Sequence, residues 1–438
     1  MAVDIGNAYL HAYTKEKLYT IAGPEFGELE GRILIIVKAL YGLKTSMSRW
    51  HEALSDKLRL LNFKSCKADP DLWIRDAGNH YEYIAVYSDD LLVFSKHPSV
   101  ILQGLSAMFP IKGGKPEFYL GGDVEAVKDE DGVFHYACSA KTYIKNVCDK
   151  IEKLYETSLR NHGSPLPDGY HPEIDTSPLL VGSEVSKYRM LIGSLNWAIT
   201  LGRFDVHYAA STMGRYQIAP REGHLEHVLR IFGYLKHHRK RRLFFDSSER
   251  EVAVGDEIEH NWSELYEGAK EEYPPDMPVP KGKPVKMTTM FDANHAHDLD
   301  TRRSVSGVLL FLNNTPVQSY CKRQGTVESS TYGSELVVAR IAVELTMGLR
   351  YRLRMMGVPI VGATVTYGDN MSVITNCSLP SSGLKKKHQA IAYHKVREAV
   401  AAGIIRLFHV PSKSNLADIL TKPLGPIKHY PLVKEILH

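Results

Sequence analysis

The chain has 438 residues and carries 54 lysines and arginines against 50 aspartates and glutamates, which gives a formal net charge of +4. This length exceeds what one hydrophobic core fills, so we expect two or three domains, and so small a charge neither requires nor excludes a nucleic-acid partner. The five cysteines form no CxxC pair and have no zinc-ligand spacing, which is typical of a reducing compartment. No run stays apolar for the roughly 18 residues of a membrane span, and the first residues do not resemble a signal peptide, so we expect an intracellular protein without a membrane partner.

The first strong pattern is a pair of strand-like runs around a polar tetrad. Residues 81–86 and 91–95 flank Tyr87-Ser88-Asp89-Asp90, which predicts a hairpin with acids at its tip. Upstream, the apolar run 32–40 predicts a strand, and the apolar spacing of residues 48–61 predicts a helix. Together these elements indicate an α+β layer.

The middle of the chain looks helical from residue 186 to residue 246 and ends in a basic cluster. The cluster consists of Lys236, His237, His238, Arg239, Lys240, Arg241 and Arg242. Such a cluster is usually a solvated face, and the alternative is a phosphate-binding surface made by its lysines and arginines. Residues 247–285 then shift to acidic residues and prolines, which predicts a semi-extended linker at the main domain boundary.

The last third of the chain predicts elements in the order βββαβααβα. Three strands come first and a long helix follows, because apolar residues recur there every three or four positions until Gly357 and Pro359 stop the pattern. The expected strands cover residues 287–291, 304–312, 316–322, 363–367 and 404–410, and the later helices begin near residues 369, 388 and 416.

Four acids in this region stand next to strand ends or helix starts: Asp292, Glu335, Asp369 and Asp418. A βββαβ sheet brings the ends of its first and fourth strands side by side, so we expect these acids to share one patch. Oxygen ligands suit Mg²⁺ or Mn²⁺, and two such ions about 4 Å apart stabilise both oxygens of a phosphodiester exchange. A single aspartate at a strand end is more often a turn or cap residue, but the joint pattern favours a metal site.

Seven motifs in this region resemble, in order, the ribonuclease H domain of copia-type retrotransposons. They are Asp292-Ala293-Asn294-His295-Ala296, Thr301-Arg302-Arg303-Ser304, Lys322-Arg323-Gln324, Ser329-Ser330-Thr331 with Glu335, Gly368-Asp369-Asn370, Asn415-Leu416-Ala417-Asp418 and Thr421-Lys422-Pro423. The resemblance implies that Asp292, Glu335, Asp369 and Asp418 hold two Mg²⁺ ions, with Mn²⁺ as an alternative, around a scissile RNA phosphate. It also implies a basic segment beside the active site that engages an RNA:DNA hybrid, made of Lys385, Lys386, Lys387 and His388.

The N-terminal region resembles the palm of a reverse transcriptase. Asp4-Ile5-Gly6-Asn7-Ala8-Tyr9 and the tetrad at 87–90 carry the likeness, together with residues 39–44, Trp50 and residues 119–121. The resemblance implies that Asp4, Asp89 and Asp90 bind metal and that Tyr9 is the steric gate for the nucleotide. Residues 188–197 and 220–224 match the segment that joins palm to ribonuclease H, so the likeness spans nearly the whole chain.

Two residues depart from the family pattern, because Ser88 replaces a small apolar residue and Gly368 stands where cysteine is common. The resemblance implies an α+β and α/β multidomain chain. Its expected parts are a palm truncated at its N-terminus (1–115), a helical thumb or connection (116–246), an acidic Pro-rich linker (247–285), a ribonuclease H-like domain (286–430) and a tail (431–438).

The implied partners are an RNA template, a DNA primer, an RNA:DNA hybrid and dNTPs, and the implied location is the cytoplasm, in a virus-like particle, with the nucleus as a second location. We expect the fingers and integrase portions of the parent polyprotein to be absent. Without fingers the nucleotide has no obvious cage, which leaves RNA-directed DNA synthesis open, whereas metal-dependent RNA hydrolysis is expected to persist.

Two other classes of function remain as alternatives. The first is a catalytically inactive retroelement relic that at most binds nucleic acid through the basic cluster. The second is a hydrolase of the Ser/His/Asp type, and the sequence contains no nucleophile-elbow motif in its favour.

Overall fold

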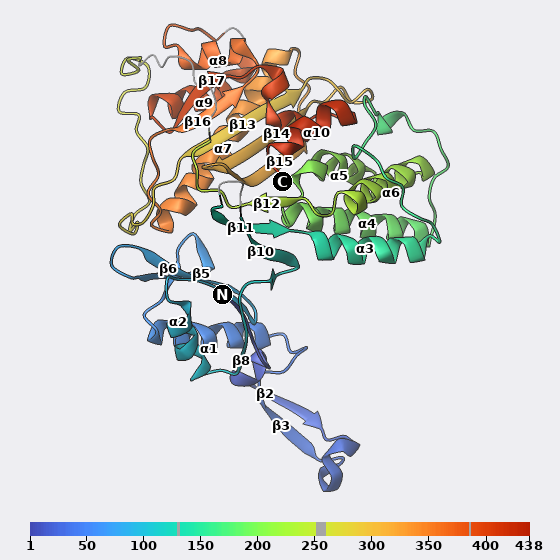
Figure 1. The fold of residues 1–438 in the computed structure, drawn as a ribbon, viewed down its shortest axis with the longest axis vertical. Coiled ribbons are helices and arrows are strands. Elements are labelled where there is room, and N and C mark those ends of the chain that lie inside the picture. Colours follow the sequence, from blue (N-terminus) through green and yellow to red (C-terminus); the bar gives the residue numbers. More distant parts are fainter. Residues whose placement is uncertain (129–131, 251–259, 385–386) are drawn as a thin grey trace. The chain divides into compact units, whose positions relative to one another are not determined.

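The computed structural model describes residues 1–128, 132–250, 260–384 and 387–438. The chain forms two compact units (Figure 1). Unit 1 comprises Met1–Leu120 with two short segments, Met277–Gly282 and Met355–Val358, and unit 2 comprises the remaining residues. Among the described residues, no helix is both long and apolar enough to cross a membrane.

Unit 1 is built on a six-stranded sheet of order β4-β5-β6-β7-β1-β8. Apolar residues alternate along β6 and β7, so one face of the sheet is buried against α1 and α2. In α1, Trp50, Leu54 and Leu58 recur every four residues and are all buried, which makes this helix amphipathic. The elements are β1 (Ala2–Ile5), η1 (Ala8–His11), β2 (Tyr13–Ile21), β3 (Ile33–Lys38), α1 (Ser46–Leu60), β4 (Lys64–Cys66), β5 (Asp69–Asp76), β6 (Tyr81–Tyr87), β7 (Asp90–Phe94), α2 (Pro98–Ser106), β8 (Ile111–Gly114) and β9 (Phe118–Tyr119).

The first part of unit 2 is a short sheet followed by helices. In the sheet, β11 pairs with β10 on one side and with β12 on the other. Arg203 and Asp205 form a buried bidentate ion pair in this part of unit 2, with a closest N–O distance of 2.7 Å. The expectation that residues 186–246 are helical is wrong at the end, because Arg242–Phe244 add a strand to the edge of β11. The elements are β10 (Gly122–Lys128), β11 (Phe134–Ser139), α3 (Lys141–Leu154), α4 (Ser183–Thr200), α5 (His207–Met213), α6 (Glu222–His237) and β12 (Arg242–Phe244).

The second part of unit 2 contains a five-stranded sheet of order β15-β14-β13-β16-β17. Strands β13, β14 and β15 are antiparallel neighbours, whereas β13, β16 and β17 run parallel. This is the strand order of a ribonuclease H-like fold, and the expected order of elements is confirmed through the fifth strand. The elements are β13 (Met287–Asn294), β14 (Val305–Leu312), β15 (Thr315–Arg323), α7 (Thr331–Met355), β16 (Thr364–Gly368), α8 (Met371–Ser378), η6 (Lys387–Gln389), α9 (Ala390–Ala401), β17 (Ile405–His409), η8 (Leu416–Leu420) and α10 (Pro426–Lys434).

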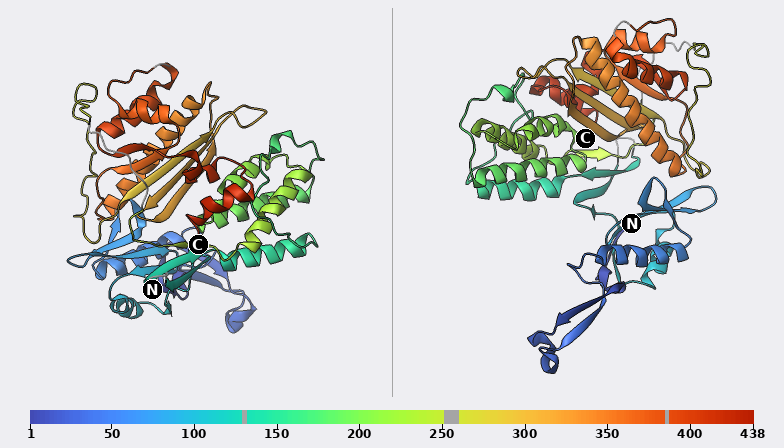
Figure 2. Two further views of the ribbon diagram at one scale, coloured as in Figure 1. Left: turned by 45° about the horizontal axis from the view of Figure 1, so that its top comes forward. Right: turned by 180° about the vertical axis from the view of Figure 1, so that it is seen from behind.

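Both faces of this sheet are covered, which is why β13 and β14 are almost continuously buried. Phe291, Val308 and Leu310 pack with α7, α8 and α9 on one face, and the view from behind in Figure 2 shows the long orange helix α7 along it. Leu309 and Phe311 belong to the core on the other face, which includes α4, α5, α6 and the C-terminal segment. The connection and the ribonuclease H-like sheet therefore share one hydrophobic core.

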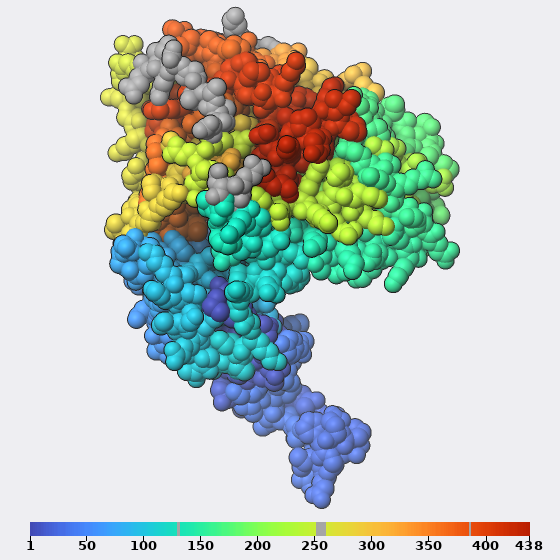
Figure 3. Space-filling model, viewed as in Figure 1, coloured from blue at the N-terminus to red at the C-terminus, as the bar shows by residue number. Residues whose placement is uncertain are grey.

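The residues expected to form a tail, 431–438, are part of this core. Leu432, Val433, Ile436 and Leu437 are all buried, and the backbone of His438 exchanges hydrogen bonds with Arg242. In Figure 3 the red C-terminal part of the chain borders the green part of unit 2. The tail assignment is therefore wrong, because the apolar spacing of α10 continues beyond the last residue of the helix.

The expected linker, 247–285, is also more closely packed than its composition indicates. Glu271 forms ion pairs with Arg350 and Arg354 of α7, and Trp262 stacks on Arg397 of α9. Residues 251–259 lie outside the described residues. We name residues 260–276 the acidic strap. They pack along the ribonuclease H-like part of unit 2, and the residues that follow them, Met277–Gly282, belong to unit 1.

Candidate active site

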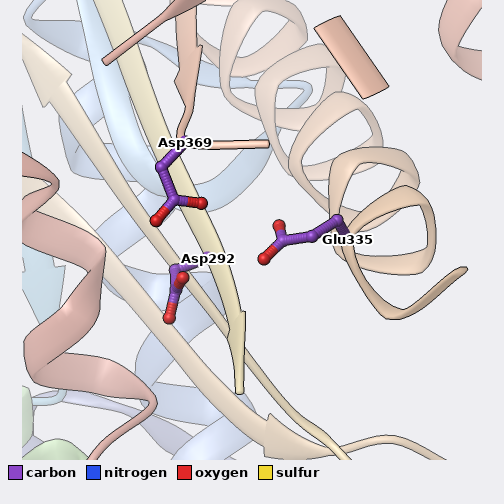
Figure 4. Close-up of side chains that lie close together, drawn as sticks. All are labelled: Asp292, Glu335 and Asp369. Atoms are coloured by element: carbon purple, nitrogen blue, oxygen red, sulfur yellow. The ribbon is translucent and has the colours of Figure 1, made fainter. Parts of the chain in front are cut away.

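Three carboxylates converge at one end of the five-stranded sheet. Asp292 lies within β13, Glu335 lies in the first turns of α7, and Asp369 directly follows β16. The parallel register pairs Met290 with Tyr367, so Asp292 and Asp369 both stand two residues beyond that pair. Ligand oxygens of all three acids lie within 4.8 Å of one another, and Figure 4 shows the carboxylates pointing together. We name these residues the acidic triad.

Asp292 and Glu335 are buried and Asp369 is half-buried, and the triad is only partly satisfied by hydrogen bonds. Asp292 is 1% exposed and Glu335 is 2% exposed. Oε1 of Glu335 accepts a hydrogen bond of 3.2 Å from the backbone N–H of Ala293, while Oε2 finds no partner among the described residues. Asp369 accepts a hydrogen bond of 2.7 Å from the hydroxyl of Ser412. A buried carboxylate oxygen without a donor is a natural ligand for a cation.

Burial also sets the electrostatics of Asp292 and Glu335. Desolvation raises the pKa of Glu335 well above its ordinary value, and the neighbouring charges of Asp292 and Asp369 raise it further. Desolvation likewise raises the pKa of Asp292, although Lys422 and the hydroxyl of Thr421 oppose this change. A bound cation would offset both the burial and the mutual repulsion of these acids.

Asp418 lies beside the triad and does not join it. The residue belongs to η8, and its Oδ1 is 2.6 Å from Nζ of Lys422, which in turn is 3.4 Å from Asp292. Burial and the charge of Asp292 raise the pKa of Asp418 to about 7. The sequence predicts that four acids share one patch; three of them form the triad, and Asp418 is linked to it through Lys422.

Two contact residues of this site are missing from the sequence-based set, Thr421 and Lys422. Both lie in the Thr421-Lys422-Pro423 motif, and this motif is the one sequence feature that could have marked them as site residues. The hydroxyl of Thr421 donates a hydrogen bond to Oδ2 of Asp292. The side chain of Asn415 donates to the carbonyl of Phe291 at 2.9 Å, which attaches the loop carrying these residues to β13.

The expected basic segment beside the triad is described only in part. Lys385 and Lys386 lie outside the described residues, and Lys387 is exposed in η6. His388 is 3.5 Å from Glu328, and Gln389 donates to the same carboxylate at 3.0 Å. Its role with nucleic acid remains a prediction.

The palm acids meet at a strand end in unit 1. Asp4 of β1 is the cross-strand partner of Asp90 in β7, and Asp89 lies in the connecting turn. Burial, together with the charges of Asp89 and Asp4, raises the pKa of Asp90. Within the described part of the chain, only Asp292, Glu335 and Asp369 meet the 4.8 Å criterion, so the palm carboxylates are neighbours without forming such a cluster.

The palm turn is held by specific contacts. Ser88 has a positive φ of 56°, and its carbonyl accepts a hydrogen bond of 2.7 Å from the indole N–H of Trp50. The ring of Tyr9, the expected steric gate, lies in η1 with its centroid 4.6 Å from that of Tyr41. The tight hairpin predicted at 87–90 is thus present, with Ser88 and Asp89 as its two turn residues.

Several members of the basic cluster form ion pairs within unit 2. Lys236 is 2.7 Å from Glu152, Arg241 is 3.3 Å from Asp205, and Arg242 is 2.9 Å from Glu125. These acids neutralise part of the cluster's charge. A nucleic-acid-binding role for Lys236, Arg239, Lys240, Arg241 and Arg242 stays a prediction.

Comparison with known proteins gives a consistent result. Residues 1–157 match the model of a family described as reverse transcriptase (RNA-dependent DNA polymerase). The retrovirus-related Pol polyprotein from transposon RE1 of Arabidopsis thaliana is 26% identical over 429 residues, which are 97% of this chain and 26% of that polyprotein. The Pol polyprotein from transposon TNT 1-94 of Nicotiana tabacum is 24% identical over 447 residues, which are 99% of this chain and 30% of that polyprotein. The chain thus spans between a quarter and a third of these relatives.

Two solved structures are also similar to the chain. RNase H1 from the archaeon Halobacterium salinarum has a TM-score of 0.25 at 15% identity, and the match covers 31% of this chain and 94% of that one. The foamy viral protease-reverse transcriptase in complex with RNA/DNA hybrid has a TM-score of 0.32 at 11% identity, covering 98% of this chain and 67% of that one.

The strand order of the C-terminal sheet and the acids at the shared end of β13 and β16 define a ribonuclease H-like part, which follows a reverse-transcriptase family region at residues 1–157. Over nearly its whole length the chain is similar to the Pol polyproteins of transposons RE1 and TNT 1-94, and its first 157 residues match the reverse transcriptase family model.

Proposed function

We propose that this chain is a reverse transcriptase/ribonuclease H polypeptide whose C-terminal part hydrolyses the RNA strand of RNA:DNA hybrids with a divalent metal at the acidic triad. The observation that carries the proposal is the convergence of three acids, in β13, in α7 and directly after β16, around Oε2 of Glu335, which has no hydrogen-bond partner among the described residues. Burial at this depth without a cation would be costly, because like charges repel strongly in a medium of low dielectric constant.

The donor set of the triad fits Mg²⁺ or Mn²⁺, because all of its ligands are carboxylate oxygens. When bound, the metal supplies activation of water and stabilisation of charge on the phosphate oxygens. The chain's own residues orient the ligands: the N–H of Ala293 holds Glu335, the hydroxyl of Thr421 holds Asp292, and the hydroxyl of Ser412 holds Asp369.

Hydrolysis of a labelled RNA:DNA hybrid by the full chain in Mg²⁺ tests this proposal. We expect the parent chain to cleave the RNA strand, and we expect Glu335→Gln and Asp369→Asn to lower the rate by about 100-fold or more. Asp300→Asn is the matched control, because Asp300 is exposed and lies outside the triad. An intact RNA strand with the parent chain, or equal cleavage by Glu335→Gln, would contradict the proposal.

RNA-directed DNA synthesis on an RNA template, from a DNA primer and dNTPs, is the second activity that we propose for this polypeptide class. The facing positions of Asp4 and Asp90 support it, with Tyr9 as the candidate nucleotide gate. It is the weaker proposal, because the palm carboxylates do not form a cluster comparable to the triad. Primer extension by the full chain tests it, and Asp90→Asn should abolish extension without changing hybrid hydrolysis.

A further inference from the structure

Lys422 is inserted between two carboxylates at the edge of the acidic triad. Its Nζ is 2.6 Å from Oδ1 of Asp418 and 3.4 Å from Asp292. The side chains of Asp292 and Asp418 are 2% and 15% exposed, so the ammonium neutralises charge where water contributes little screening. The chain therefore already carries a cation next to its candidate metal site.

Asp292 is shared between this ammonium and the triad. Its Oδ2 accepts the hydroxyl of Thr421, and both of its oxygens lie 3.4 Å from Nζ of Lys422. A carboxylate offers about four lone-pair positions. Some of those of Asp292 are already occupied by the hydroxyl of Thr421 and the ammonium of Lys422. The side chain of Asp418 is linked to Asp292 through this ammonium, and Asp418 is not a member of the triad.

The position of the ammonium favours one divalent ion over two. Nζ of Lys422 already lies between Asp292 and Asp418 and offsets part of the charge of these two carboxylates. A second ion placed between Asp292 and Asp418 would also have to displace Nζ of Lys422 from both acids.

We propose that Lys422 serves as the built-in second cation of this site: the acidic triad takes one divalent metal, and the ammonium occupies the position between Asp292 and Asp418 where a second metal would bind. The inference rests on the proposed metal-dependent function of the triad. Lys422 is a positioning residue in this scheme, because it acts through Asp292 and Asp418 and supplies charge without activating water.

The test is the number of Mn²⁺ ions bound per full chain, measured by calorimetric titration and by electron paramagnetic resonance of free Mn²⁺. Each count is taken as the difference from Asp292→Asn, so that any binding elsewhere cancels. We expect one ion for the parent chain, one for Lys422→Arg, which keeps the charge, and two for Lys422→Met. The control is Lys428→Met, with one ion expected, because Lys428 is 69% exposed and lies 3.9 Å from Asp168.

A second readout is thermal unfolding in the absence of divalent ions. Lys422→Met should have a lower Tm than Lys428→Met, because Asp292 and Asp418 lose their counter-charge. Addition of Mn²⁺ should then raise the Tm of Lys422→Met more than it raises the Tm of Lys428→Met.

Two Mn²⁺ ions in the parent chain, or a count that stays at one in a folded Lys422→Met, would overturn the role of Lys422. The count for the parent chain decides by itself if Lys422→Met does not fold. If the parent chain and Asp292→Asn bind the same number of Mn²⁺ ions, the proposed metal site itself is contradicted. The failure of the metal site and the failure of the role of Lys422 are therefore distinguishable.

Discussion

At the scale of single residues, the site depends on how each buried acid is oriented. Asp292 is 1% exposed and is approached by two side chains from the loop after η8, those of Thr421 and Lys422. Donors of this kind hold a metal ligand in its binding rotamer and keep it ionised. Removing one of them should weaken metal binding even though the triad stays intact.

Thr421→Val is the most specific of such changes, because valine keeps the shape of threonine and removes only the hydroxyl. We expect Mn²⁺ affinity, measured by titration of the full chain, to fall by about 10- to 100-fold. Thr375→Val, at an exposed position in α8, is the control and should leave affinity unchanged. Equal affinities for the two variants would show that the hydroxyl of Thr421 does not orient Asp292.

The three triad acids could be predicted from the sequence because each stands next to a recognisable strand or helix boundary. The contacts of Thr421 and Lys422 could not, since a hydrogen bond between residues 129 positions apart leaves no periodic pattern. For the same reason, the separation of Asp418 from the triad by an ammonium was not predictable from spacing.

At the scale of elements, two helices of unit 2 carry histidines with little access to water, of which His207 is half-buried and His429 is buried. His207 of α5 accepts or donates one hydrogen bond of 2.9 Å with Ser319, and His429 of α10 lies 3.2 Å from the carbonyl of Asp205. Burial lowers the pKa of each histidine to about 4. Both side chains are therefore neutral in the folded protein at pH 7.

These histidines predict a loss of stability in mild acid. The unfolded chain binds protons below its ordinary histidine pKa of about 6.5, and the folded chain does not, so the free energy of unfolding falls as pH drops from about 6.5 to 4. Denaturant unfolding across this range measures the slope. His429→Gln should reduce the change in the free energy of unfolding between pH 6.5 and pH 4 by up to about 3 kcal/mol. An unchanged dependence on pH would contradict the assignment of a neutral, buried His429.

The acidic strap is the element that composition misrepresents. Its prolines and acids resemble a linker, yet Glu271 accepts hydrogen bonds from the guanidinium of Arg350 at 2.7 Å and 2.6 Å and also pairs with Arg354. The partners lie 79 and 83 residues further along the chain, which explains why local composition did not reveal the packing. The strands and α7 were predictable, because their patterns are local.

Glu271→Gln tests whether this ion pair holds the strap. Loss of the charge leaves two nearly buried arginines without their carboxylate, so we expect faster proteolytic cleavage within residues 260–276 and a loss of stability of about 3–5 kcal/mol. The neighbouring exposed Glu272 provides the control as Glu272→Gln. Identical cleavage of the two variants would show that the strap is held by other contacts.

At the scale of the whole molecule, sequence and structure agree on the two kinds of domain and differ in how they are grouped. The sequence suggested a main boundary at 247–285, whereas the compact units separate after Leu120, and the connection shares its core with the ribonuclease H-like sheet. A shift in composition can indicate a linker, but it does not indicate which domains share a hydrophobic core. The palm acids lie in unit 1 and the triad lies in unit 2, so we expect substitution of a palm acid to leave hydrolysis at the triad unchanged.

Cleavage of the RNA strand of an RNA:DNA hybrid, compared for Asp292→Asn and Asp89→Asn in the full chain with Mg²⁺, tests this account most directly. We predict that Asp292→Asn loses about 100-fold or more of the hydrolysis rate and that Asp89→Asn cleaves like the parent chain. Undiminished cleavage by Asp292→Asn, or an equal loss in Asp89→Asn, would contradict a hydrolytic site built on Asp292, Glu335 and Asp369.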